Sequence, residues 1–133
     1  MPYIKATDYV RASLEPVVPG ELNYAMTMQA IFYLMGQIDM GEFRGKVEEL
    51  CAGFMECNGV SYTNYNNMIG ALTCCGWELV RRANDERAVA ADNCQKVLVE
   101  VGYRIYYELV VPYEDTKIAE NGDVYPKNLV RGS

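Results

Sequence analysis

The sequence predicts an all-α protein, a compact bundle of about five helices with an irregular C-terminal tail. Half of its 133 residues are apolar, which is enough for a chain of this length to bury a core. Apolar side chains recur at helical spacing, and almost no stretch alternates as a strand does. Turn residues separate these stretches at short intervals. We therefore expect residues 1–128 to form a single helical domain.

The first two helices differ in character. Thr7 and Asp8 can cap a short first helix, which Pro16 then helps to stop. The second helix is expected from Glu21 to about Ile38, and it is apolar around nearly its whole circumference. Such a helix is usually central or lies between protomers, so much apolar surface favours self-association.

A capping signal precedes the third helix. Asp39 and Glu42 have the spacing of a capping box, and Asn58 with the following glycine marks the end of the helix. Between these signals the apolar residues fall at helical spacing: Phe43, Val47, Leu50, Cys51 and Phe54.

The fourth helix has the clearest apolar stripe in the chain. Ser61 or Thr63 opens it, and the stripe continues through Tyr65, Met68, Ile69, Leu72, Cys75, Leu79 and Val80. Gly70 and Gly76 also lie within it. Because a glycine inside a helix costs about 1 kcal/mol relative to alanine, we expect another helix to pack closely against this face.

The fifth helix follows a break at residues 84–86, Asn-Asp-Glu, where acidic side chains suit the positive end of its dipole. Its stripe, Cys94, Val97, Leu98, Val101, Ile105 and Leu109, leads to Pro112, where we expect the irregular tail to begin. Residues 129–133 are either a protease-tag remnant or a native end.

Composition argues against several classes of protein. A net charge of −6 and only one small basic patch, Arg81-Arg82, argue against nucleic-acid binding. The five cysteines form no Cys-x-x-Cys pair and the chain has no histidine, so we predict no zinc site and expect reduced thiols in a cytosol. No targeting signal and no apolar stretch of membrane-spanning length is apparent, so we expect a protein without a membrane partner.

No catalytic residue, metal or cofactor is predicted. Without histidine, a nucleophilic serine or cysteine lacks its usual base. Helical carboxylates such as Glu48, Glu49 and Glu100 keep open the alternative of a metal-dependent all-α nucleotide pyrophosphohydrolase. Such enzymes carry Glu-x-x-Glu on one helix, whereas Glu48 and Glu49 are adjacent and point apart.

Three groups of residues are candidates for binding a ligand or partner. Asn23 and Tyr24 form a polar pair near the start of an apolar helix, and either cap it or face the tail or a ligand. The arginine pair is the second group, Arg81 and Arg82. The third is the tail, which either lines a pocket or straps the bundle with Tyr113 and Tyr125 as buried anchors: Tyr113, Glu114, Asp115, Lys117, Asn121, Asp123 and Tyr125.

Short motifs at both termini and in the middle of the chain form a recognisable set: Pro2-Tyr3-Ile4, Glu21-Leu22-Asn23-Tyr24, Ile69-Gly70-Ala71-Leu72, and Pro112-Tyr113-Glu114-Asp115 through Asn121-Gly122-Asp123-Val124-Tyr125. In these motifs the chain resembles an uncharacterised family of small proteins from tailed phages and prophages. The resemblance implies a site of action in the cytoplasm of a bacterial host. In the similar proteins the arginine pair leads directly into the tail, whereas here residues 83–109 form a helix-patterned insertion.

These observations lead to one hypothesis and two alternatives. We hypothesise a phage-encoded, non-enzymatic binding protein, a helical homo-oligomer that engages a host protein or sequesters a small nucleotide-like ligand. The pyrophosphohydrolase is the first alternative, and a minor structural protein of the virion is the second.

Overall fold

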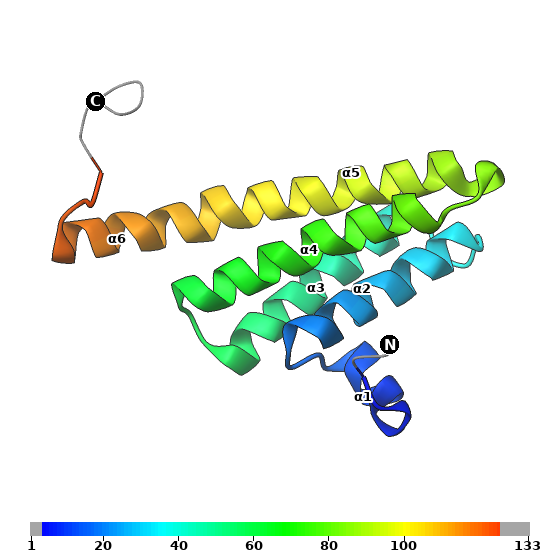
Figure 1. The fold of residues 1–133 in the computed structure, drawn as a ribbon, viewed down its shortest axis with the longest axis horizontal. Coiled ribbons are helices and arrows are strands. Elements are labelled where there is room, and N and C mark those ends of the chain that lie inside the picture. The colour runs from blue at the N-terminus through cyan, green and yellow to red at the C-terminus, as the bar shows by residue number, and fades with distance from the viewer. Residues whose placement is uncertain (1–3, 126–133) are drawn as a thin grey trace. The chain divides into compact units, whose positions relative to one another are not determined.

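The computed structural model describes residues 4–125, and all regular structure in that range is helical. The elements in order are a 3₁₀ turn η1 (Ala6–Asp8), α1 (Tyr9–Leu14), α2 (Pro19–Leu34), α3 (Met40–Asn58), α4 (Tyr62–Arg82), a 3₁₀ turn η2 (Asp85–Arg87), α5 (Ala88–Ile105), a π-helical turn η3 (Tyr106–Val110) and α6 (Val111–Asn121) (Figure 1). The all-α prediction is confirmed. Residues 129–133 lie outside the described residues.

The described residues belong to two units, divided between Tyr103 and Arg104. The first contains α1 to α4 and most of α5, and the second contains η3 and α6. Among residues 4–125, no helix combines the length and the apolar composition that crossing a bilayer requires. The prediction of a single domain over residues 1–128 stays a prediction.

Helix α2 is the central helix of the first unit. It contacts α1, α3 and α4, and its buried side chains include Leu22, Met26 and Ala30. Helix α2 is therefore central within one protomer. The sequence had allowed either this position or one between protomers, because the helix is apolar around nearly its whole circumference. The predicted range of 21–38 is shifted, because Pro19 occupies the first turn, where its missing N–H costs nothing. Gly36, with φ of 75°, ends the helix early.

The caps of α3 and α4 follow the predicted signals. The Asp39 carboxylate accepts from the Glu42 backbone N–H at 2.8 Å, and the Glu42 side chain accepts from the Asp39 backbone N–H at 3.2 Å. Ser61 caps α4 by accepting from the Asn64 backbone N–H at 3.0 Å. Gly59, with φ of 89°, turns the chain between the two helices. These bonds satisfy backbone donors that the helix ends leave free.

Helix α5 packs against α3 and α4. A Cβ atom built on Gly76 would lie 3.0 Å from Gln95 Cγ, so this glycine does permit the predicted close approach. Gly70 is different, because a Cβ there would meet nothing within 4 Å, and the same explanation is wrong for it. An ion pair between Arg44 and Glu100 links α3 to α5.

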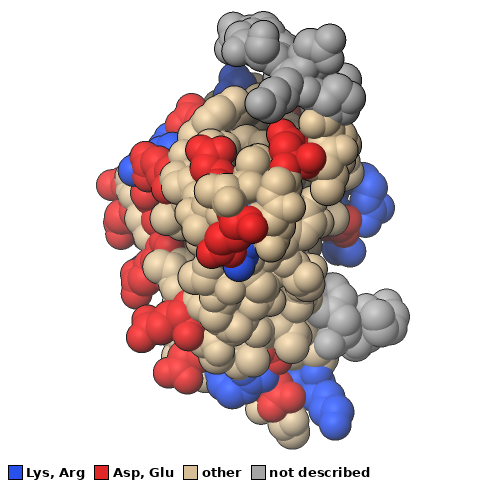
Figure 2. Space-filling view, turned by 90° about the vertical axis from the view of Figure 1, so that its left-hand side faces the viewer, with Lys and Arg blue, Asp and Glu red and all other residues tan. Residues whose placement is uncertain are grey.

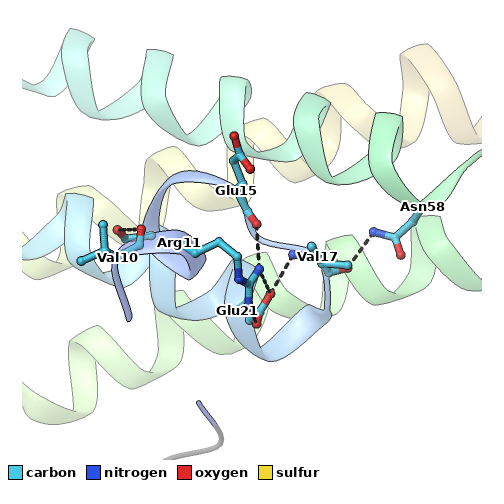
Figure 3. Close-up of polar contacts among 7 residues, drawn as sticks. Val10, Arg11, Glu15, Val17, Glu21 and Asn58 are labelled. Atoms are coloured by element: carbon cyan, nitrogen blue, oxygen red, sulfur yellow. Dashed lines mark hydrogen bonds and ion pairs between the residues drawn. The ribbon is translucent and has the colours of Figure 1, made fainter. Parts of the chain in front are cut away.

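Helix α1 is fastened to α2 by a polar cluster (Figure 3). Figure 3 shows Arg11 and Glu21 pointing toward one another, and both Nη atoms of Arg11 donate to the two carboxylate oxygens. The Val17 backbone N–H also donates to Glu21, at 2.9 Å, and Asn58 on α3 donates to the Val17 carbonyl at 2.7 Å. The hydrogen bonds from Arg11 are the main cause that holds the pKa of the buried Glu21 below its usual value.

The second unit corrects the prediction for the tail. The chain is helical to Asn121, so the non-helical ending begins at Gly122 rather than after Pro112. Pro112 is tolerated because it lies in the first turn of α6, directly after η3, whose Val111 N–H donates to the Tyr106 carbonyl. The π-helical turn thus accommodates a proline that would break a regular helix.

Candidate functional site

A pocket of about 650 Å³ lies in the first unit, between α2, α4 and the loop that follows α4. This volume falls within the range of small-molecule sites. The two helices run in the same direction (Figure 1), so Asn23 lies near the Cys74 end of the pocket and Leu34 near the Arg82 end. At a helical rise of 1.5 Å per residue, Cys74 and Arg82 are about 12 Å apart along the axis. The pocket therefore has two separate ends.

The first end carries a short chain of hydrogen bonds. Thr27 Oγ1 donates to Asn23 Oδ1 at 3.2 Å and lies 3.4 Å from Cys75 Sγ. Burial raises the pKa of the Cys75 thiol to about 11, so the sulfur keeps its proton at neutral pH. The thiol can therefore donate to Thr27 while Thr27 donates to Asn23.

An aromatic side chain stands beside Asn23. Tyr24 is among the residues that line the pocket, and its ring stacks on Tyr9 of α1, with centroids 5.5 Å apart and planes inclined by 20°. Ile31, Leu34 and Leu79 add apolar side chains to the pocket wall.

The second end carries the charges. Glu78 accepts hydrogen bonds from Arg81 Nη2 at 2.7 Å and from Arg82 Nε, and these bonds hold its pKa below the usual value. The Glu78 carboxylate thus stays ionised and already has donors. Arg87 follows in η2, where its backbone N–H donates to Asn84 Oδ1 at 3.1 Å. Arg82 and Arg87 line the pocket with Glu78, so its lining carries one net positive charge.

That local charge contrasts with the rest of the chain, whose net charge is −6. On the face shown in Figure 2, acidic side chains are more prominent than basic ones. A pocket lined by two arginines and one glutamate is therefore a local exception, and it suits an anionic group.

The structure brings together the first two groups of candidate residues. Asn23, Tyr24 and Arg82 line one pocket, and Arg81 shares Glu78 with Arg82. Asn23 does not cap α2, because the helix begins four residues earlier, at Pro19. The capping interpretation of this pair is therefore wrong, and both residues line the pocket instead.

The third group belongs to the second unit. Tyr113 and Glu114 are half-buried on α6, where Lys117 Nζ lies 5.6 Å from the Tyr113 ring centroid. The other members are exposed: Asp115, Lys117, Asn121, Asp123 and Tyr125. The exposure of Tyr125 contradicts the interpretation in which it is a buried anchor. The Tyr125 backbone N–H instead donates to Asp123 Oδ1 at 3.0 Å, a local turn contact.

The binding residues predicted from the sequence did not include four polar residues of the pocket: Thr27, Glu78, Asn84 and Arg87. The sequence contains features that could have pointed to two of these residues, Thr27 and Glu78. Thr27 is a polar residue within an apolar helix, four residues after Asn23. Glu78 precedes Arg82 by four residues, the spacing of a helical ion pair. Within the described part of the chain, no three His, Cys, Asp or Glu side chains are grouped so that they could hold a metal ion.

The fold and the pocket define a small helical protein with a donor-rich cavity of ligand size. The chain belongs to the family described as a domain of unknown function, DUF6899, whose model matches residues 1–124. No curated protein and no solved structure matches the chain.

Proposed function

We propose that the chain is a non-enzymatic binding protein of a tailed phage or prophage, and that it sequesters a small nucleotide-like ligand in the pocket between α2 and α4. The observation that carries the proposal is the charge of the pocket, which two arginines and one glutamate line in a chain of net charge −6. Guanidinium groups bind phosphate and carboxylate oxygens through paired, charge-assisted hydrogen bonds.

The uncharged part of the pocket supports the same ligand class. Tyr24 contributes an aromatic side chain, and Ile31, Leu34 and Leu79 contribute apolar side chains to the pocket wall. A ligand that joins a flat ring to an anionic group matches this arrangement, since each part meets side chains of its own chemistry.

Calorimetric titration of the full chain with nucleoside mono-, di- and triphosphates tests the proposal. We expect binding by the wild type and roughly tenfold or greater weakening in the double variant Arg82→Ala/Arg87→Ala, because each lost guanidinium removes charged hydrogen bonds. Lys46→Ala is the matched control, since Lys46 is an exposed cation outside the pocket. A wild type that binds none of these nucleotides, or a double variant that binds as well as the wild type, would overturn the proposal.

Self-association in the host cytoplasm is the second part of the proposal. Large apolar side chains remain exposed on α4 and α5, among them Trp77 at 64%, Val89 at 74% and Tyr103 at 61%. Exposed apolar surface of this kind favours contact with another copy or with a host protein. Trp77 is the sole tryptophan, so its emission should shift to shorter wavelength as the concentration rises. Sedimentation as a monomer at all concentrations would contradict self-association.

A further inference from the structure

The orientation of the Asn23 side chain is fixed by its neighbours. Asn23 Oδ1 accepts from Thr27 Oγ1, which itself lies in contact with the protonated thiol of Cys75. No described residue accepts a hydrogen bond from Asn23 Nδ2. Because Asn23 lines the pocket, the group that it can offer a ligand there is the amide NH₂, a donor.

Two acceptor atoms at the opposite end, Asn84 Oδ1 and Glu78 Oε1, are engaged. Asn84 Oδ1 accepts from the Arg87 backbone N–H, and the Glu78 carboxylate accepts from Arg82. Groups at that end that can still meet a ligand are guanidinium N–H donors, the NH₂ of Asn84 and Glu78 Oε2, an acceptor outside the bonds that Arg81 and Arg82 make to Oε1. The pocket therefore has hydrogen-bond donors at both ends, with apolar side chains also in its wall.

We infer that Asn23 is a specificity-determining residue, which donates from Nδ2 to an acceptor atom on the uncharged ring of a ligand whose anionic group lies at Arg82 and Arg87. This inference rests on the proposed function and adds the orientation of the ligand and the chemistry of its ring. A ring that presents a carbonyl oxygen satisfies Asn23, whereas a ring that presents an amino group leaves two donors facing one another.

Two purine nucleotides allow a ring with a carbonyl oxygen to be compared with a ring that has an amino group. Inosine monophosphate presents a carbonyl oxygen at the ring position where adenosine monophosphate presents an amino group, in the way that guanine differs from adenine. The full chain should bind inosine monophosphate roughly fivefold more tightly, the factor that corresponds to one neutral hydrogen bond. The ratio of the two dissociation constants is the informative quantity, since effects on the shared phosphate cancel in it.

Asn23→Asp tests the role of Asn23 directly, because a carboxylate accepts where the amide donates. We expect the ratio to fall below one in this variant, and to keep its wild-type value in Arg87→Ala, where both nucleotides bind more weakly. Asn93→Asp carries the same charge change at a half-buried position outside the pocket and should leave the ratio unchanged. Equal binding of both nucleotides by the wild type, or an unchanged ratio in Asn23→Asp, would overturn the inference and leave the proposed function standing.

Thr27 acts on the ligand only by positioning Asn23. Thr27→Val keeps the shape of the side chain but removes the hydroxyl, so the amide can rotate and the ratio should approach one, while Thr27→Ser should restore it. A wild-type ratio in Thr27→Val would refute this positioning role. Failure of the wild type to bind either nucleotide would refute the inference and the nucleotide proposal together.

Discussion

Two pockets of the first unit are nearly equal in volume and opposite in charge. The pocket between α2 and α4 measures about 650 Å³ and contains Arg82 and Arg87, whereas the pocket under the α1–α2 linker measures about 590 Å³ and contains Glu15, Glu49 and Glu56. No lysine or arginine lines the second pocket. Volume alone therefore does not distinguish a candidate ligand site in this fold. The two pockets differ in their charged side chains and in their hydrogen-bond donors, and we base the proposed site on these differences.

Charge reversal in the first pocket should give the largest effect. Arg87→Glu replaces a guanidinium by a carboxylate beside the proposed phosphate, so nucleotide affinity should fall roughly 30-fold or more. Glu56→Lys makes the opposite reversal in the acidic pocket and should change the affinity little, because Glu56 lies outside the proposed site. Equal losses in the two variants, measured by calorimetry, would mean that net charge rather than the pocket governs binding.

The wall of the acidic pocket depends on the contact between Arg11 and Glu21, because residues 14–17 of the linker form part of that wall. Glu21→Gln should lower the free energy of unfolding by about 1–3 kcal/mol at pH 7, since it weakens charged hydrogen bonds from Arg11 and Val17. Urea denaturation measures this change. Nucleotide affinity in the first pocket should stay at the wild-type value.

The contact between Arg11 and Glu21 predicts that the free energy of unfolding depends on pH. The folded pKa of Glu21 is depressed, so its contribution is complete above the unfolded value of 4.5 and is lost as the pH falls through the lower folded value. Wild type and Glu21→Gln should therefore converge in stability below pH 4.5 and differ most near neutrality. A difference in unfolding free energy between wild type and Glu21→Gln that stays constant from pH 7 to below pH 4.5 would contradict the stabilising role of the Glu21 carboxylate.

Removing the charge of Glu78 should change nucleotide affinity less than Arg87→Glu does, and in the opposite direction. Glu78→Gln releases Arg81 and Arg82 from a carboxylate, so an anionic nucleotide should bind roughly threefold more tightly. Because the pKa of Glu78 is lowered from 4.5, protonation in the wild type should mimic the variant only below that pH. Calorimetry at pH 7 should show the gain, and weaker binding in Glu78→Gln would indicate that Glu78 orients the arginines.

The two glycines of α4 provide the smallest effects. Gly70→Ala places a methyl group in open space and should stabilise the fold by up to about 1 kcal/mol. Gly76→Ala brings the new Cβ to 3.0 Å from Gln95 Cγ and should destabilise it by about 1 kcal/mol. Thermal denaturation of both variants compares an exposed helix surface with a close helix contact.

Much of the fold was predictable from local signals. The capping box at Asp39 and Glu42 and the cap at Ser61 are formed by neighbours in sequence, so their spacing was sufficient. The helix that continues beyond Pro112 was not predicted, because a proline stops most helices. No pattern in the sequence indicated the π-helical turn that precedes this proline.

The pocket was only partly predictable. Asn23, Tyr24 and Arg82 drew attention as polar residues near helix ends, but their shared pocket depends on α2 and α4 packing side by side. Thr27 and Arg87 were missed because their roles come from contacts, with Cys75 across the two helices and with Asn84 at the next turn. Neither the tertiary contact of Thr27 nor the local turn at Arg87 leaves a periodic apolar pattern in the chain.

A crystal structure of the full chain with inosine monophosphate tests the central claim most directly. The account predicts the phosphate beside Arg82 and Arg87, and the ring beside Tyr24 with its carbonyl oxygen accepting from Asn23 Nδ2. A nucleotide bound in the acidic pocket, bound in the reverse orientation, or absent at saturating concentration would contradict it.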